Sequence, residues 1–168
     1  QGMNGWQVGK FARLVMALLV MTALLPLSAG CDDRPVDERV VTEDGRRFLA
    51  VEIAGRDYRL ELATTPMQRF RGLSDRASIA EDGGMLFVFP NARRRAFVMR
   101  RCLVPIDIIY IAPDGRIVSM HEMKVEPPDT PEHELIEYPS DWPAQFVIEL
   151  KGGSLDKLDL QKGQRLKY

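Results

Sequence analysis

From residue 48 onward, the apolar residues of this sequence come in short runs that stop at proline, glycine or aspartate. The clearest pair of runs flanks Ala112-Pro113-Asp114-Gly115, and a second pair flanks Ala54-Gly55-Arg56-Asp57; both turns are typical of β-hairpins. The runs predict about eight short strands, at 48–53, 58–63, 85–89, 96–101, 106–111, 116–120, 145–150 and 164–168. The expected fold is mainly β (α+β), a compact barrel-like domain, closed or half-closed.

One or two short helices complete the expected domain. Thr65 is a suitable N-cap, Pro66 suits the first helical position, and Gln68 completes a capping box. The pattern predicts a helix over residues 66–73, and residues 154–158 predict a single helical turn. Proline recurs through residues 126–143, "EPPDTPEHELIEYPSDWP", which predicts a long irregular loop.

Length and charge limit the classes of protein to consider. The chain has 168 residues, of which 45% are hydrophobic and 28% charged, enough for one core. The formal net charge is −1, which gives no electrostatic reason to expect a nucleic-acid partner. We therefore expect a single folded domain over residues 48–168 and no nucleic-acid binding.

The N-terminus has the pattern of a secretory signal. Basic residues at positions 10 and 13 precede an apolar run over 14–25, and small residues follow at 28–30. This pattern predicts a signal peptide over residues 1–30. The apolar run is shorter than the ~20 residues that span a bilayer, which leaves a retained anchor helix as the less favoured interpretation.

The segment Leu27-Ser28-Ala29-Gly30-Cys31 resembles the lipobox of bacterial lipoproteins, in which the cysteine carries the lipid. Asp32 and Asp33 match the pattern that retains such lipoproteins at the inner membrane. The resemblance implies a membrane anchor on Cys31 and a location at the periplasmic face of the inner membrane. Ordinary cleavage before Cys31, giving a soluble periplasmic protein, is the alternative. Residues 31–47 are charged and predict a tether.

Sequence motifs for common catalytic and metal sites are missing. There is no phosphate-binding glycine loop, no HExxH, no nucleophile elbow and no cysteine pair with zinc spacing. His121 and His133 are the only histidines, and their spacing favours solvated loop residues over metal ligands. We expect no metal and no cofactor.

Charges interrupt the apolar stretch "AFVMRRCLVPIDIIYI", residues 96–111. An inward arginine needs a partner, and Asp107 is the nearest carboxylate, so a structural pair of Asp107 with Arg100 or Arg71 is expected. The alternative is a ligand clamp in which the guanidinium binds a carboxylate or phosphate through two hydrogen bonds.

Four ordered motifs resemble the DUF192 (UPF0127) family: "TPMQRFRGLSDR", "EDGGMLFVFP", "AFVMRRCLVPIDIIYIAPDGRIVSM" and "YPSDWPAQFVIELKGGSLDKLDLQKG". The resemblance covers residue 50 to the C-terminus and implies a compact, mainly β fold without an established activity. Where the family usually has Trp, Lys, Asn and Thr, this chain has Val98, Arg100, Arg101 and Cys102. The ligand-binding residues expected from the arginines and these motifs are Arg71, Arg76, Met85, Phe97, Met99, Arg100 and Asp107.

Three functional hypotheses follow. The first is a lipid-anchored periplasmic binding or accessory module for a small anionic or polar ligand, such as an envelope glycan fragment. The second is an envelope enzyme with Cys102 as nucleophile, Arg100 or Arg101 lowering its pKa, and His121 as base. The third is a ligand-free module that binds another envelope protein.

Overall fold

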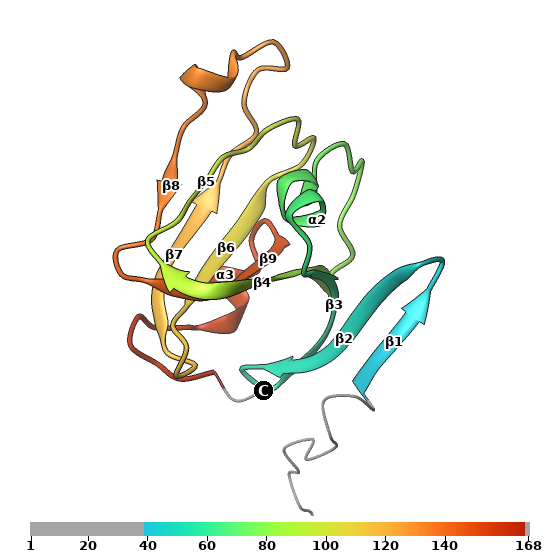
Figure 1. Cartoon of the computed structure of the whole chain (residues 1–168), viewed down its shortest axis with the longest axis vertical. Coiled ribbons are helices and arrows are strands. Elements are labelled where there is room, and N and C mark those ends of the chain that lie inside the picture. Colours follow the sequence, from blue (N-terminus) through green and yellow to red (C-terminus); the bar gives the residue numbers. More distant parts are fainter. Residues whose placement is uncertain (1–38, 167–168) are drawn as a thin grey trace, which may run out of the picture. The chain divides into compact units, whose positions relative to one another are not determined.

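The computed structural model describes residues 39–166, which form a mainly β domain (Figure 1). Seven strands make one sheet in the order β1-β2-β3-β4-β9-β6-β7, and β5 pairs with β8 in a separate two-stranded ribbon. The expected fold class is confirmed. The strands are β1 (Val40–Glu43), β2 (Arg46–Ile53), β3 (Arg56–Ala63), β4 (Gly83–Arg93), β5 (Ala96–Phe97), β6 (Ile106–Ile111), β7 (Ile117–Met123), β8 (Tyr138–Pro139) and β9 (Ala144–Lys151).

Part of the expected tether is folded. Strand β1 pairs with the start of β2 through an Asp44-Gly45 turn, in which both residues have positive φ. The prediction of a tether over 31–47 is therefore wrong for residues 40–47. The Asp-Gly turn is a hairpin signal, and the charged, exposed strands around it concealed that signal. The predicted signal peptide, Cys31 and the first part of the tether lie outside the described residues.

The helix after β3 forms as its capping sequence predicts. Helix α2 (Pro66–Arg71) begins at Thr65, whose Oγ1 accepts a hydrogen bond from the Gln68 amide at 3.3 Å. The Gln68 side chain in turn accepts one from the Thr65 amide at 3.0 Å. The helix ends at Gly72, where φ is 53°. Residues 73–82 then lead from the helix to β4, which runs parallel to β3.

The segment 96–101 is not the strand that the sequence predicts. Only Ala96 and Phe97 pair, with β8, and the chain then turns, with the Cys102 amide donating to the Met99 carbonyl at 3.1 Å. Arg101 has a φ of 51° at this turn. The segment therefore turns after Phe97 instead of continuing as a strand.

The C-terminal part differs in detail. Strand β4 continues past the predicted stop at Pro90 to Arg93, with an irregular register against β9 after Val88. The loop before β8 contains one 3-10 turn, η1 (Glu132–Glu134). Helix α3 (Leu155–Leu158) is the expected single turn. In place of the expected last strand, the described residues show one isolated bridge between Arg116 and Arg165.

Each face of the large sheet buries its own hydrophobic cluster. One face, which we name the α2 face, carries Phe87 of β4, Ile108 of β6 and Val147 of β9. The other face, the concave face, carries Leu60 of β3 and Ile148 of β9. Alternating side chains of one strand therefore serve two cores.

The sheet curls without closing. On the concave face, side chains of β2 join the same cluster as side chains of β6, although three strands separate them in the sheet. The end strands β1 and β7 are not paired with each other, so the sheet is not closed into a barrel. Among residues 39–166, no helix has the length and apolar character needed to cross a membrane.

Candidate functional site

A cavity of about 260 Å³ opens on the α2 face, where the end of α2 and the 96–102 segment meet strands β4 and β9. Its lining combines aromatic rings, three arginines and one carboxyl group. The lining residues are Arg69, Phe70, Arg71, Gly72, Leu73, Ser74, Phe87, Phe89, Ala96, Phe97, Val98, Arg100, Cys102 and Glu149.

Glu149 is the one carboxyl group of this lining. It lies in β9 opposite Met85 of β4 and Ile108 of β6, and it is only 5% exposed. Its Oε2 is buried and has no hydrogen-bond partner. Burial raises the pKa of Glu149 to about 8, although the nearby positive charge of Arg76 lowers it in part. At neutral pH the carboxyl group is protonated and has an O–H to donate.

Gly72 lies beside Glu149 on the side of α2. A Cβ at this position would lie 3.8 Å from Glu149 Oε2 and 3.5 Å from Phe87 Cζ. Gly72 also has a positive φ, which disfavours any larger residue. The helix end thus makes the sharp turn and places no side chain next to the carboxyl group.

Aromatic rings form one wall of the cavity. Phe97 packs edge-on against Phe87, with ring centroids 5.0 Å apart, and against Phe89 at 6.5 Å. Behind Phe97 lies Tyr110, at 5.8 Å, whose hydroxyl donates to the Tyr138 carbonyl. Such edge-to-face pairs fix ring positions, so the wall is rigid and apolar.

Two of the three arginines in the lining, Arg69 and Arg71, differ in whether other residues hold their side chains. Arg69 is fixed, because its Nη1 donates to the Thr64 carbonyl at 2.6 Å and to the Val88 carbonyl at 2.9 Å. Arg71 is exposed and forms no ion pair within residues 39–166. Arg71 is therefore available to a ligand anion.

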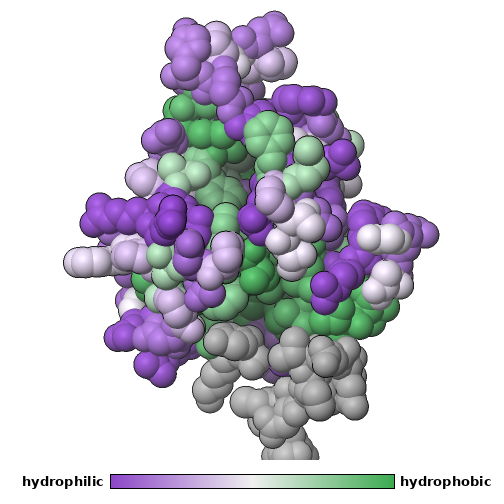
Figure 2. Space-filling model, in the orientation of Figure 1, coloured by the Kyte–Doolittle hydropathy of each residue, from purple (hydrophilic) through white to green (hydrophobic). Residues whose placement is uncertain are grey.

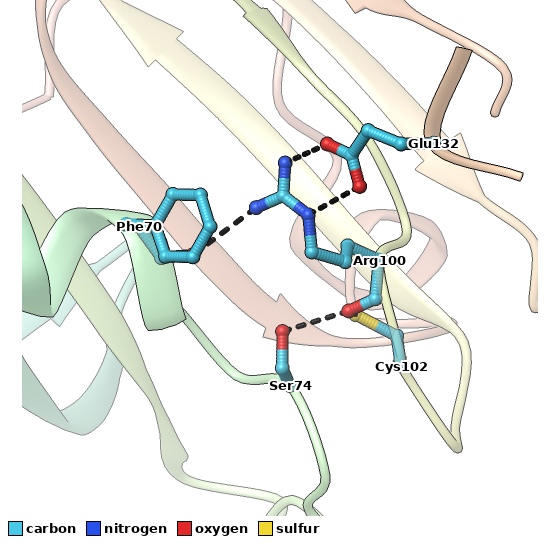
Figure 3. A network of polar contacts seen from close by, with 5 residues as sticks. All are labelled: Phe70, Ser74, Arg100, Cys102 and Glu132. Carbon is cyan, nitrogen blue, oxygen red and sulfur yellow. Dashed lines mark hydrogen bonds and ion pairs between the residues drawn. The ribbon is translucent and has the colours of Figure 1, made fainter.

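Arg100 already holds a carboxylate, from the loop before β8. Its Nε donates to Glu132 Oε2 at 2.6 Å, and its Nη2 contacts Glu132 Oε1 (Figure 3). The guanidinium lies over the Phe70 ring, 4.4 Å from its centroid. The hydrogen bond to Arg100 lowers the pKa of Glu132 and raises the pKa of Arg100. The pair shows that this position accepts a carboxylate through two hydrogen bonds.

The backbone of Arg100 is also fixed to the α2 side of the cavity. Ser74 Oγ donates to the Arg100 carbonyl at 2.7 Å (Figure 3). Next to it, Arg101 Nε donates to Asp75 Oδ1 at 2.9 Å, and the Asp75 amide donates to the Arg101 carbonyl at 2.9 Å. These contacts join the two loops that frame the opening.

The structure places the expected ligand-binding residues in different parts of the fold. Arg71, Phe97 and Arg100 line the cavity. Met85 and Met99 are buried in the adjoining core. Arg76 lies outside the lining and pairs with Glu61 at 2.7 Å. Of the residues expected from the arginines and the family motifs, three thus line the cavity.

Asp107 is a structural residue on the opposite face of the sheet. Its Oδ2 accepts a hydrogen bond from the Leu155 amide at 2.7 Å, at the start of α3. The predicted pair of Asp107 with Arg100 or Arg71 is wrong, since Arg100 pairs with Glu132 instead. Strand alternation explains the error: 107, 109 and 111 share the concave face, whereas the cavity lies on the face of 106, 108 and 110.

Among residues 39–166, Cys102 and His121 form hydrogen bonds with different partners: Cys102 Sγ donates to the Arg100 carbonyl, and His121 contacts Pro139. Burial raises the pKa of Cys102 to about 12, so the weakly nucleophilic thiol predominates at neutral pH. His121 packs between Tyr110 and Tyr138, and its Nε2 lies 2.8 Å from the Pro139 carbonyl oxygen. Among the described residues, no group of three or more His, Cys, Asp or Glu side chains could hold a metal ion.

Sequence reasoning missed Glu149 and Glu132. A signal for Glu149 was present, because it is a single acid in the otherwise apolar run "FVIEL" of a strand that pairs on both edges. Glu132 gave no such signal, since it lies in a proline-rich loop among other acids. Its partner became visible only in the folded chain.

A mainly β domain with a part-polar cavity on one face defines the class. The DUF192 family, described as "Uncharacterized ACR", matches residues 49–168. The chain belongs to this family. A search of the curated proteins found no match.

Two solved structures are similar to the chain. A protein from Sinorhizobium meliloti, named as a candidate transcription regulator, is 32% identical with a TM-score of 0.58, over 77% of this chain and 89% of that protein. A protein of unknown function from Novosphingobium aromaticivorans is 23% identical with a TM-score of 0.62, over 77% of this chain and 92% of that protein. The second likeness supports the fold alone.

Proposed function

We propose that this domain is a binding module for a small anionic ligand, attached through lipid on Cys31 to the periplasmic face of the inner membrane. The observation that carries the proposal is Glu149, a buried carboxyl group without a hydrogen-bond partner on Oε2 in a cavity bordered by arginines. A buried polar atom left unpaired costs stability. A ligand oxygen that accepts its proton would remove that cost.

The chemistry of the lining restricts the ligand. Glu149, protonated at neutral pH, donates to a hydroxyl, ether or carbonyl oxygen. Phe87 and Phe97 offer apolar edges to the carbon skeleton, and Arg71 binds a carboxylate or phosphate. An acidic sugar or another small hydroxy acid of the cell envelope combines these features.

Glu132 supports an anionic ligand independently. Its carboxylate occupies the fork of Arg100 in the same way that a ligand carboxylate would. The loop that carries Glu132 is exposed, with the glutamate side chain 60% accessible. We propose that a ligand anion exchanges with Glu132 at Arg100 and releases this loop.

The pH dependence of binding tests the proposal. Thermal stabilisation is measured with glucuronate, inorganic phosphate and neutral N-acetylglucosamine, on the chain from residue 32 on. Glucuronate is expected to stabilise the domain, with an affinity that falls about tenfold per pH unit above 8 as Glu149 ionises and repels the anion. Glu149→Gln should bind with little change between pH 6 and 9.

Arg71→Ala and Arg47→Ala form a matched pair for this experiment. Arg71 lines the proposed site, whereas Arg47 borders the concave face. We expect about tenfold weaker glucuronate binding for Arg71→Ala and no change for Arg47→Ala. If neither glucuronate nor inorganic phosphate stabilises the wild-type domain, or if binding is independent of pH, the proposal is wrong.

A protein-interaction role is the second candidate. Met67 and Phe70 of α2 are 69% and 64% exposed, next to the opening of the cavity, and exposed apolar groups of this size mark contact surfaces when they form a patch. Crosslinking of the membrane-attached full chain tests this role. A crosslinked envelope protein lost with Met67→Ser and Phe70→Ser would support it, and no specific product would contradict it.

A further inference from the structure

A second cavity, of about 330 Å³, lies on the concave face of the same sheet. Its walls come from the inward side chains of β2, β3, β4 and β9, because the sheet curls but β1 and β7 do not meet. Figure 2 shows hydrophobic surface in the hollow beside strands β2 and β3. The walls include Leu49, Leu60, Leu62, Leu86, Ile148 and Phe146.

The walls select a hydrocarbon ligand. They are aliphatic apart from the Phe146 ring, and the polar lining residues are Arg39, Arg47, Glu52 and Thr64. A polar ligand would lose its hydrogen bonds to water at the aliphatic walls without replacement. Walls that are aliphatic except for one ring suit a flexible chain better than a flat ring.

Basic side chains border this apolar cavity. Arg47 shares the inward side of β2 with Leu49 and Val51, so its stem lies against the cavity and its guanidinium at the edge. Arg47 forms no ion pair within residues 39–166. Arg39 is 8% exposed, and its buried Nε has no hydrogen-bond acceptor within residues 39–166. With Glu52 as the only acid of the lining, the edge is net positive.

We propose that the concave face binds a long-chain fatty acid, with the hydrocarbon chain in the cavity and the carboxylate at Arg47 and Arg39. The proposal is independent of the function assigned to the α2 face, since the two cavities share no lining residue. An apolar chain with one terminal anion is the ligand class that matches both the walls and the edge.

A chain-length series tests the hydrocarbon part of the proposal. The chain from residue 32 on, without the signal segment, is titrated with octanoate, decanoate, dodecanoate and palmitate, below the concentrations at which they form micelles. Burial of each added methylene is expected to raise the affinity about fourfold until the cavity is full. Native mass spectrometry should show one fatty acid per chain.

Variants test the location. Val88→Trp fills the cavity from β4 and should abolish palmitate binding, whereas Val41→Trp, the same change at an exposed position of β1, should not. Arg47→Gln should weaken palmitate about tenfold and hexadecanol little. Arg47 is exposed, so this variant remains informative if Val88→Trp does not fold. Glu149→Gln should leave palmitate binding unchanged.

Several results would overturn the fatty-acid proposal. Affinity that does not depend on chain length, or equal binding by wild type and both cavity variants, would show a non-specific surface effect. A dimer that dissociates with Val88→Trp would identify a second copy of the chain as the occupant. If the lipidated full chain excludes palmitate that the unlipidated chain binds, the occupant is its own acyl chain.

Discussion

The two faces of the central sheet are made by the same strands and differ in chemistry. In β9, Glu149 faces the cavity on the α2 face, and its neighbours Ile148 and Leu150 face the concave side. In β4, Phe87 and Leu86 divide in the same way. One strand thus supplies a carboxyl group to a part-polar cavity and aliphatic groups to an apolar one. The alternation of the strand, with period two, is sufficient to keep the two environments apart.

The two faces also differ in the surroundings of their charged side chains. On the α2 face, the carboxyl group of Glu149 is buried and its Oε2 has no partner. Of the arginines around it, Arg69 is held by backbone carbonyls and Arg100 is paired with Glu132. The concave face has a buried unpartnered polar atom of its own, Nε of Arg39, but this atom borders a cavity with aliphatic walls. A buried ionisable group is expensive unless it has a role. The difference between the two linings, part-polar on the α2 face and mainly aliphatic on the concave face, favours the α2 face as the site of polar recognition.

The largest expected effect comes from a substitution that disrupts both faces of the sheet at once. Gly84 lies where β4 meets β9, and a Cβ there would be 2.2 Å from the Glu149 carbonyl oxygen. Because that contact is with backbone, Gly84→Ala should force the strands apart and prevent stable folding. Thermal unfolding followed by circular dichroism measures this. Gly153→Ala, where a Cβ would have nothing within 4 Å, should cost only about 1 kcal/mol from its positive φ. A stable Gly84→Ala protein with one cavity intact would contradict the shared-strand description.

The second effect isolates the α2 face. Burial raises the folded-state pKa of Glu149 to about 8 from an ordinary value of 4.5. Between these values the folded state keeps a proton that the unfolded state has lost, so stability falls as pH rises from 4.5 to 8. The expected fall in the folding equilibrium constant is about tenfold per pH unit.

Glu149→Gln removes this titration. The variant should match the wild type near pH 5 and exceed its stability at pH 8, as measured by urea unfolding. Glu122→Gln makes the same change at an exposed position of β7 and should keep the wild-type pH profile. Equal pH profiles for wild type and Glu149→Gln would show that Glu149 titrates normally.

The third effect concerns Arg100. Glu132→Gln removes the internal carboxylate from its guanidinium. Since a ligand anion then has no competitor, glucuronate affinity should rise several-fold, with little change in stability because the pair is partly exposed. Isothermal titration with glucuronate measures the change. Glu134→Gln, two residues away and outside the Arg100 contacts, is the control. Weaker binding by Glu132→Gln would mean that Glu132 contacts the ligand instead of competing with it.

The smallest effect tunes Glu149 from outside the cavity. Arg76 pairs with Glu61 and its charge lowers the pKa of Glu149 in part. Arg76→Gln should therefore raise the pKa of Glu149 further and extend the fall in stability to higher pH. An unchanged pH profile would show that Arg76 does not act on Glu149.

The sequence predicted the hairpins, helix α2 and the mainly β class, because turn residues and the capping box act over a few positions. It failed where long-range contacts decide. The segment 96–101 turns at Met99 instead of extending, and Arg100 finds Glu132, 32 residues away, in place of Asp107. Curling without closure is also a property of the whole sheet that no local pattern contains.

The candidate site was predictable only in part for the same reason. Arg71, Phe97 and Arg100 were found from their apolar or motif context, and they do line the cavity. Glu149 required knowledge of which face of β9 looks toward α2. A single residue shift in strand register reverses that assignment, so the carboxyl group could be placed only from the folded chain.

The titration of Glu149 tests most directly whether the α2 face holds a neutral, ligand-binding carboxyl group. Carbon-13 NMR of the glutamate side-chain carboxyl groups, assigned by comparison with Glu149→Gln, follows its protonation from pH 4 to 10. We expect one carboxyl group with a pKa of about 8 that shifts when glucuronate binds. A Glu149 signal that titrates near 4.5 and does not respond to glucuronate would contradict a neutral, ligand-binding carboxyl group on the α2 face.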